Sequence, residues 1–311
     1  MTVTVHDMAP RPPRGPARES FERFVRWTIE EELPAAPGFI PPGEREAFQA
    51  YYRNLPAAGD EPALARYLRG MWRGEAGWTA RWIAARLERF PDVRVLDAGS
   101  GFGTYSMLYA AIGAEVIGVD LRPDRLSAAA RRLAFHAARS GQALPVRYER
   151  ADLTRRWERG YDLVWVYNAL SHIDPLEEFL AAVRAHLRPG GVLVVGDING
   201  SNPAHLKKLE SVRTAVHQEY VAPDGERHAY AVERPFPPGE LRQIMVRAGF
   251  RVLHHELYWG GLGVVPDALY AGLLAPLQRQ WWLGGSSARR QLMVATPAAS
   301  VSPGLTLVRR G

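Results

Sequence analysis

The sequence predicts an α/β protein, with a mostly parallel sheet covered by helices on both faces and a helical N-terminal lid. From Val93 onward, short apolar segments typical of strands alternate with helical segments, the order that builds a parallel sheet. Residues 19–90 contain no strand-like segment, and their apolar residues recur every three or four positions as in amphipathic helices. We therefore expect a disordered Pro/Arg-rich leader at 1–17, a helical cap at 18–90, a core at 91–200 and a C-terminal completion of the sheet at 201–311.

Five apolar segments are predicted as strands of the core, at 93–99, 114–120, 145–150, 161–168 and 192–198. Helices are expected between them, from a glycine-rich turn to Leu108, over 123–140 and over 175–187, and a Pro-Gly-Gly turn at 189–191 precedes the fifth strand. In the C-terminal third we expect helices at 203–220 and 238–248, separated by a polar stretch, and two strands at 250–259 and 290–298.

The long connection at 260–289 is apolar and carries the paired Trp281 and Trp282. Such a segment could touch a membrane surface or a lipid-like substrate. Pro276 and interspersed arginines interrupt its apolar face, so a homodimer contact or burial in the core is favoured.

The composition excludes several classes of protein. The 311 residues include no cysteine, which rules out disulfide scaffolds, cysteine-ligated metals and thiol nucleophiles. No apolar run approaches the roughly 18 residues of a membrane helix, and the N-terminus lacks the apolar centre of a signal peptide, so a cytoplasmic protein is expected. Basic residues outnumber acidic ones by 39 to 33 but are scattered along the chain, which disfavours nucleic acid as a partner.

The most informative segment is Asp97-Ala98-Gly99-Ser100-Gly101-Phe102-Gly103, which follows an apolar strand and precedes a helix. Its glycines allow a tight turn and a close approach to a ligand. The dinucleotide fingerprint G-x-G-x-x-G would need a glycine at Thr104, so a nicotinamide dehydrogenase is disfavoured. Asp97 suits a ligand with an ammonium group better than a pyrophosphate.

Two further acids follow the next two strands. Asp120 can accept hydrogen bonds from both hydroxyls of a ribose, and Asp152 can accept one from an exocyclic amine such as that of adenine. A single strand-end aspartate is more often a helix cap or a turn former. Three of them at neighbouring strand ends, beside a glycine loop, favour a ligand site instead.

The segments VLDAGSGFGTYS, VIGVDLRPDRL, ERADL, YDLVWVYNALSHIDP and LRPGGVLVV, in this order, resemble the class I S-adenosylmethionine-dependent methyltransferases, and among them the small-molecule branch related to quinone-biosynthesis methyltransferases. The resemblance is strong over residues 90–200 and plausible over 236–298. It implies a Rossmann-like sheet of seven strands, in which the last strand is antiparallel and lies between the fifth and the sixth. It also implies S-adenosylmethionine as the cofactor and a small molecule as the acceptor.

The resemblance assigns roles to individual residues. Asp97 and the glycine loop would face the methionine portion, Asp120 would bind the ribose and Asp152 the adenine amine. Asn168 would offer its carbonyl near the amino-acid end, and Arg73 would meet the carboxylate. The complete expected cofactor set is Asp97, Ala98, Gly99, Gly101, Gly103, Asp120, Leu121, Asp152, Leu153, Asn168 and Arg73.

His172 is the best-placed candidate for a general base, although a structural role in the wall of the site is an open alternative. Tyr105, at the start of the helix after the glycine loop, Trp78 in the lid and Tyr230 in the C-terminal insertion are candidates for acceptor binding. No metal is expected, because oxygen ligands at the strand ends are too few for Mg²⁺, and neighbouring residues such as His254 and His255 point to opposite faces of a strand.

The sequence therefore predicts transfer of a methyl group to a small-molecule acceptor, with oxygen the favoured atom and carbon or nitrogen as alternatives. An RNA methyltransferase would need its arginines gathered around the cleft. A non-catalytic cofactor-binding scaffold of the same fold would keep the architecture without turnover.

Overall fold

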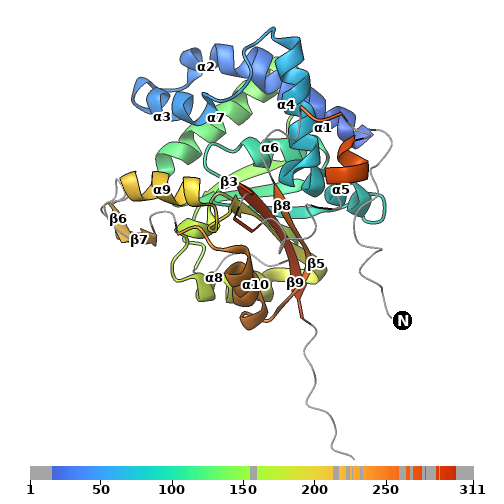
Figure 1. Cartoon of the computed structure of the whole chain (residues 1–311). Coiled ribbons are helices and arrows are strands. Elements are labelled where there is room, and N and C mark those ends of the chain that lie inside the picture. The colour runs from blue at the N-terminus through green and yellow to red at the C-terminus, as the bar shows by residue number, and fades with distance from the viewer. Residues whose placement is uncertain are drawn as a thin grey trace, which may run out of the picture.

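The computed structural model describes residues 16–154, 160–212, 217–221, 225, 227–231, 234–258, 264–266, 269–274, 277, 285–286 and 288–298. Most of the expected leader and of the apolar connection 260–289 therefore lies outside the described residues. The described part contains one sheet of seven strands, with helices above and below it, and a separate two-stranded hairpin (Figure 1).

The sheet has the strand order β3-β2-β1-β4-β5-β9-β8. Strands β1 to β5 are parallel, whereas β9 runs antiparallel to both of its neighbours, β5 and β8. This confirms the expected fold class and the insertion of the last strand. The strands are β1 Arg94–Ala98, β2 Glu115–Asp120, β3 Val146–Arg150, β4 Tyr161–Tyr167, β5 Leu187–Ile198, β8 Phe250–Tyr258 and β9 Arg290–Pro297.

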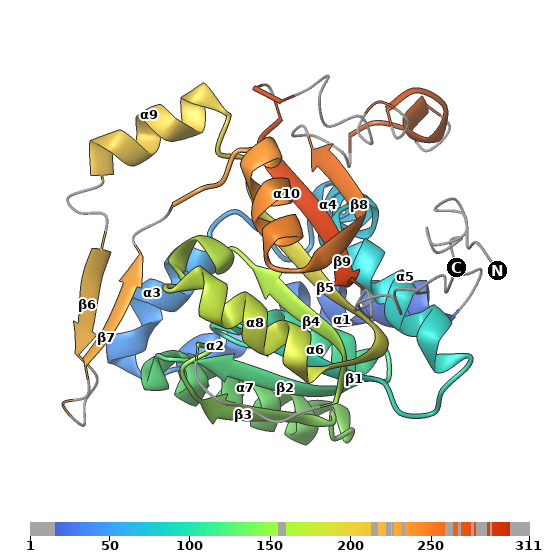
Figure 2. The same ribbon diagram turned by 90° about the horizontal axis from the view of Figure 1, so that it is seen from below.

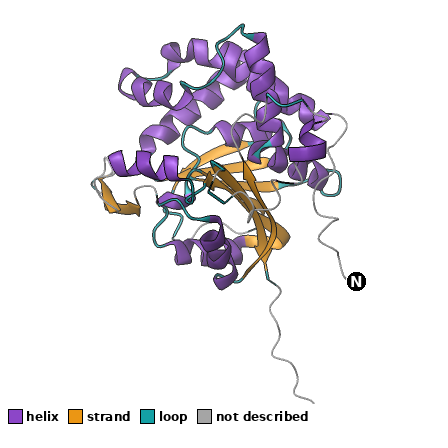
Figure 3. Ribbon diagram, in the orientation of Figure 1, coloured by secondary structure: helices purple, strands orange, loops and turns teal. Residues whose placement is uncertain are grey.

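Helices cover both faces of the sheet, as Figures 2 and 3 show from two directions. The N-terminal helices gather on one side of it and form the cap, whereas α8 and α10 lie on the opposite side. The cap consists of α1 Pro16–Trp27, the π-helix η2 Thr28–Glu32, α2 Leu33–Phe39, α3 Pro42–Tyr52, α4 Glu61–Arg73 and α5 Glu75–Leu87. The remaining helices are α6 Thr104–Ala111, α7 Pro123–Ser140, η3 Leu170–His172, α8 Leu176–His186, α9 Pro203–Val212, α10 Pro238–Arg247 and η4 Tyr270–Leu274. Among the described residues, no helix combines the length and the apolar character needed to cross a membrane.

Two apolar cores lie on the two faces of the sheet, because successive strand residues point in opposite directions. Val95, Leu163 and Trp165 belong to the core shared with the cap and α6. Their neighbours Leu96 and Val164 belong to the core shared with α8 and α10. Strands that are buried on both faces explain why these segments read as continuous apolar runs in the sequence.

The C-terminal insertion differs from the sequence prediction. The helix expected over 203–220 ends at Val212, and His217–Val221 forms β6, which pairs in antiparallel fashion with β7 at Arg227–Ala231. The polar stretch thus contributes a hairpin rather than a loop. A Pro-Asp-Gly sequence, typical of turns, separates the two strands.

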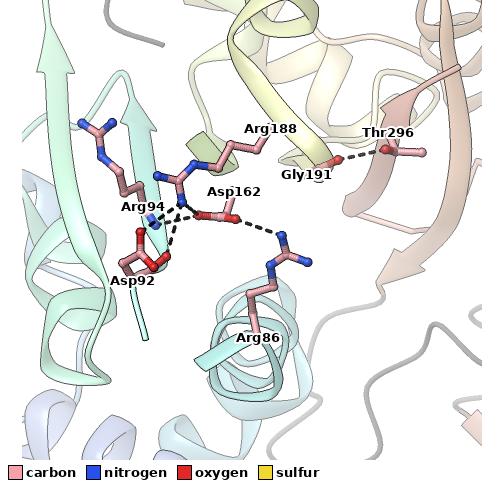
Figure 4. A network of polar contacts seen from close by, with 7 residues as sticks. All are labelled: Arg86, Asp92, Arg94, Asp162, Arg188, Gly191 and Thr296. Carbon is pink, nitrogen blue, oxygen red and sulfur yellow. Dashed lines mark hydrogen bonds and ion pairs between the residues drawn. The ribbon is translucent and has the colours of Figure 1, made fainter. Parts of the chain in front are cut away.

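A network of polar contacts joins the amino-terminal ends of the parallel strands β1 and β4 to their neighbours (Figure 4). The buried carboxylate of Asp162 accepts hydrogen bonds from the Arg94 amide (3.0 Å), from Arg86 (3.1 Å) and from Arg188 (2.8 Å). It therefore joins β4 to β1, to α5 and to the start of β5. Thr296 of β9 adds a hydrogen bond to the Gly191 carbonyl (2.8 Å).

We expect Asp162→Ala to lower the free energy of unfolding by about 2 kcal/mol, less than for a fully buried ion pair because the arginines stay partly in water. Urea unfolding measures this loss. Glu149→Ala is the matched control, because it removes an exposed pair with Arg147 (2.9 Å) and should cost less than about 0.5 kcal/mol. Equal effects of the two substitutions would contradict a structural role for Asp162.

Candidate active site

The glycine loop, residues 99–103, connects the end of β1 to the start of α6. Its first two amides, those of Gly99 and Ser100, both donate to the Val119 carbonyl (2.8 and 2.9 Å), which turns the chain over the end of β2. Gly99, Gly101 and Gly103 have positive φ angles of 77°, 53° and 74°. Residues other than glycine rarely adopt this region of backbone conformation.

The three glycines are needed for different reasons. A Cβ at Gly99 would lie 2.6 Å from the Cβ of Ala169, and one at Gly103 would lie 2.1 Å from the hydroxyl of Tyr148. A Cβ at Gly101 would meet nothing within 4 Å. A side chain at Gly101 would therefore meet free space, whereas Gly103 faces Tyr148, so its small size serves internal packing.

Asp120 ends β2 directly beside this loop. Its Oδ2 accepts the Gly101 amide (2.9 Å), and its Oδ1 accepts the Arg122 amide (2.9 Å). The carboxylate is thus fixed between the loop and the start of α7. A rigid carboxylate at a strand end is well suited to bind paired hydroxyls.

A cavity of about 220 Å³, here called the strand-end cavity, opens over the carboxyl ends of the parallel strands. It brings together seven residues that the sequence singled out: Gly99, Asp120, Leu121, Asp152, Leu153, Asn168 and His172. Asp152 is oriented by the amide and hydroxyl of Thr154, which donate to its Oδ1 (2.9 and 2.7 Å). The cavity is therefore lined by the acids Asp120, Asp152 and Asp174, and by the apolar side chains of Leu121 and Leu153.

Asp97 lies deeper than the other two acids. Its side chain is buried and accepts a hydrogen bond from the Ser106 hydroxyl (2.6 Å). Burial raises the pKa of Asp97 to about 7, against the opposing effect of that hydrogen bond. Ala98 is buried in the core beneath α8. Neither residue lines the strand-end cavity.

A second cavity, of about 310 Å³, lies beneath the cap and is here called the cap cavity. Its walls include Tyr105 and Tyr167 (ring centroids 4.7 Å apart), Tyr67 of α4 and Thr28 of η2. Among the described residues, Asn168 is the only one that lines both cavities. The two cavities therefore adjoin at the end of β4.

Asn168 is held in place by its neighbours. It adopts a positive φ of 50°, a conformation that asparagine tolerates better than most residues. Its backbone N–H donates to the Gly196 carbonyl (2.9 Å), and its side-chain Oδ1 accepts a hydrogen bond from Arg290 (2.9 Å). Arg290 also pairs with Glu75 (2.7 Å), so β9 and α5 both brace the junction of the cavities.

Two of the expected site residues are found elsewhere, and the side chain of a third is not among the described parts of the structure. Arg73 donates to the Val265 carbonyl (2.7 Å) and stacks over the Tyr270 ring, so its guanidinium is directed to the C-terminal connection and not to either cavity. Trp78 is buried in the core beside His254. Tyr230 belongs to β7, and its side chain lies outside the described residues.

Two buried hydroxyls without partners lie in the glycine loop and in the cap cavity. The hydroxyl of Ser100 in the glycine loop and that of Thr28 in the cap cavity are buried, and neither has a hydrogen-bond partner among the described residues. Buried polar groups are rarely left unpaired, so both are candidates to bind polar atoms of a ligand. Within the same part of the chain, no group of three or more acidic or histidine side chains could hold a metal ion.

The sequence reasoning missed several residues of this region. Glu32, Tyr52 and Arg132 lie behind the glycine loop, and Ser106 holds Asp97. Arg132 occurs in an alanine- and arginine-rich helix, where a solvent-exposed position is the ordinary expectation. Of these residues only Ser106 could have been suspected from the sequence, because it lies in the first turn of the helix after the loop, close to Asp97.

Comparison with known proteins agrees with this architecture. Residues 96–193 match the family model described as a methyltransferase domain. A ubiquinone biosynthesis O-methyltransferase from Burkholderia pseudomallei is 30% identical over 176 residues, which cover 55% of this chain and 70% of that protein. One from Brucella anthropi is 27% identical over 53% of this chain and 62% of its own length, less than two thirds. The magnesium protoporphyrin IX methyltransferase from Synechocystis has the same fold, at 14% identity and a TM-score of 0.50, with 89% of this chain and 100% of that chain covered.

The order of the strands and the family match define an α/β protein of the methyltransferase type. The chain belongs to the S-adenosylmethionine-dependent methyltransferase family.

The buried carboxyl of Asp97 should make stability depend on pH. Because its pKa is raised to about 7 in the folded state, the folded protein holds this proton more tightly than the unfolded chain. The contribution is fully present below about pH 4 and is lost as the pH rises through about 7. Asp97→Asn, which resembles the protonated carboxyl, should therefore gain free energy of unfolding relative to wild type between pH 5 and pH 8. Urea titrations at both pH values measure the difference, and a constant difference would contradict the raised pKa.

Proposed function

We propose that this protein transfers a methyl group from S-adenosylmethionine to the oxygen of a small-molecule acceptor. The observation that carries the proposal is that Asp120 and Asp152 line one cavity together with Gly99 and Asn168. Acids at the ends of the neighbouring strands β2 and β3 suit the ribose hydroxyls and the adenine amine of a nucleoside.

The residues around the glycine loop fit the rest of the cofactor. A side chain at Gly101 would meet free space, and the buried hydroxyl of Ser100 has no hydrogen-bond partner among the described residues. S-adenosylmethionine, when bound, supplies a methyl group that its sulfonium already activates. The protein then has mainly to hold the reactants in line and to exclude water, and the cap over the adjoining cavity suits that task.

The acceptor would bind in the cap cavity, which meets the strand-end cavity at Asn168. Its described walls contain no Asp, Glu, His, Lys or Arg. Burial raises the pKa values of Tyr105 and Tyr167 above the ordinary value, so these phenols are poor bases near neutral pH. This chemistry favours an acceptor whose hydroxyl is acidic in itself, such as a phenol or an enol, over a simple alcohol.

The names of the relatives support oxygen as the methylated atom, because those described above are named O-methyltransferases. His172 lines the strand-end cavity rather than the cap cavity, so we assign it to the wall of the nucleoside site and not to proton removal.

Asp120→Ala should weaken the binding of S-adenosylhomocysteine by about 1–3 kcal/mol, since the ribose loses its acceptor and the Gly101 amide loses its partner. Isothermal titration calorimetry measures the change. Asp124→Ala is the control, because Asp124 pairs with Arg122 nearby without lining the cavity. Equal affinities of wild type and Asp120→Ala would overturn the ribose assignment and, with it, the proposed function.

His172→Asn should raise the KM for S-adenosylmethionine severalfold and leave the pH dependence of kcat unchanged. With two phenolic acceptors of different acidity, the rise of kcat with pH should follow the pKa of each acceptor, because the described walls supply no base. If the variant instead loses an ionisation common to both acceptors, His172 is the general base and the wall assignment is wrong.

A further inference from the structure

A buried ion pair joins the cap to the core behind the glycine loop. Glu32 ends the π-helix η2, Arg132 lies in the middle of α7, and both side chains are fully buried. The contact is bidentate, because Nε and Nη2 of Arg132 donate to the two carboxylate oxygens of Glu32, the second at 2.9 Å. Burial of two charges is costly, and such a pair is weak evidence for stability as such. Its position therefore calls for another explanation.

The remaining nitrogen of Arg132 reaches the glycine loop. Its Nη1 donates to the Phe102 carbonyl (2.5 Å), to the Tyr52 hydroxyl (2.6 Å) and to the hydroxyl of Thr104 (2.8 Å). Phe102 lies between two glycines of positive φ, and Thr104 is the first residue of α6. One guanidinium thus binds the cap, the glycine loop and the start of the following helix.

The glycine loop also contacts Asp120 at the end of β2 and aromatic side chains of α3 in the cap. The Gly101 amide donates to Asp120, the acid of the strand-end cavity. The Phe102 ring packs in the cap against Phe48 and Tyr51, with ring centroids 5.3 and 5.5 Å apart. The consecutive loop residues Gly101 and Phe102 therefore contact Asp120 of the strand-end cavity and aromatic rings of the cap, respectively. A movement of the cap that displaced Glu32 would change the contacts of the peptide next to Gly101.

We propose that Arg132 is a positioning residue, which couples closure of the cap to the conformation of the glycine loop and hence to nucleoside binding. Neither Arg132 nor Glu32 lines the strand-end cavity. The identity of the nucleoside rests on the proposed function, but the coupling between cap and loop does not. The π-helix contributes to the device, because its single wide turn carries Thr28, which lines the cap cavity, and Glu32, which binds Arg132. Such π-helical turns are frequent at functional sites.

Arginine is suited to this position, and lysine is not. The planar guanidinium has five N–H groups in a fixed fork, which satisfies a carboxylate on one edge and loop oxygens on the other. An ammonium group at the same place has three donors and no fork. Arg132→Lys should therefore keep the charge but lose part of the contact to the loop.

The test replaces the pair by apolar residues of similar size, Glu32→Leu with Arg132→Met, so that no charge is left buried alone. We expect this double variant to fold with a cooperative unfolding transition, while the amides of residues 101–104 exchange hydrogen faster than in wild type. Its affinity for S-adenosylhomocysteine should fall by about tenfold, the effect of losing a hydrogen bond to a charged group. Arg132→Lys should change both measurements in the same direction and by less.

The matched control is Glu31→Gln with Arg139→Gln, which removes an exposed ion pair (3.1 Å) between the same two elements without touching the loop. It should leave exchange and affinity unchanged. If the apolar double variant keeps both the wild-type exchange of the loop and the wild-type affinity, the pair is only structural and the proposal is wrong. If the double variant does not fold, the exchange measured on Arg132→Lys decides in the same way.

The two proposals can fail separately. Absence of S-adenosylhomocysteine binding to wild type would contradict the proposed function. Hydrogen exchange of the unliganded loop would still decide whether Glu32 and Arg132 control its conformation.

Discussion

The glycine loop is the element on which the site depends, and charged groups hold it from two sides. Asp120 accepts its Gly101 amide, and Arg132 donates to its Phe102 carbonyl. Without these contacts the three glycines would let the loop adopt many conformations, because glycine is the residue with the most backbone freedom to lose on folding. The contacts hold the loop in the conformation with positive φ angles. The parallel sheet supplies one anchor through β2, and the cap supplies the other through Glu32. The conformation of the glycine loop at the strand ends thus depends on contacts from both the sheet and the cap.

This division explains why two cavities adjoin rather than merge. The strand-end cavity is built by loops of the sheet and carries the acids, whereas the cap cavity is built largely by helices and is rich in tyrosine. Asn168, braced by Arg290 and Glu75, separates them. Charged side chains therefore line the strand-end cavity and are absent from the described walls of the cap cavity.

The sequence predicted the sheet well because strands that are buried on both faces leave a strong local signal, and strand ends bring Asp120 and Asp152 to one edge of the sheet. It predicted the helical cap but not its contacts. Arg73 was expected in the site from its place in the lid, yet its guanidinium binds the Val265 carbonyl, a partner 192 residues away. Arg132 lies 100 residues from Glu32, and nothing in its own helix marks it as buried. The β6–β7 hairpin was missed because its polar residues lack the apolar alternation of a half-buried strand.

The proposed methyl transfer requires that the strand-end cavity binds the nucleoside of S-adenosylmethionine. The most direct measurement is a crystal structure of the protein grown with S-adenosylhomocysteine, compared with one grown with NAD. We expect S-adenosylhomocysteine to bind with its ribose hydroxyls on Asp120, its adenine amine at Asp152 and its sulfur beside Asn168, and we expect no NAD in the second crystal. Occupation of the cavity by NAD, or a ribose bound away from Asp120, would contradict it.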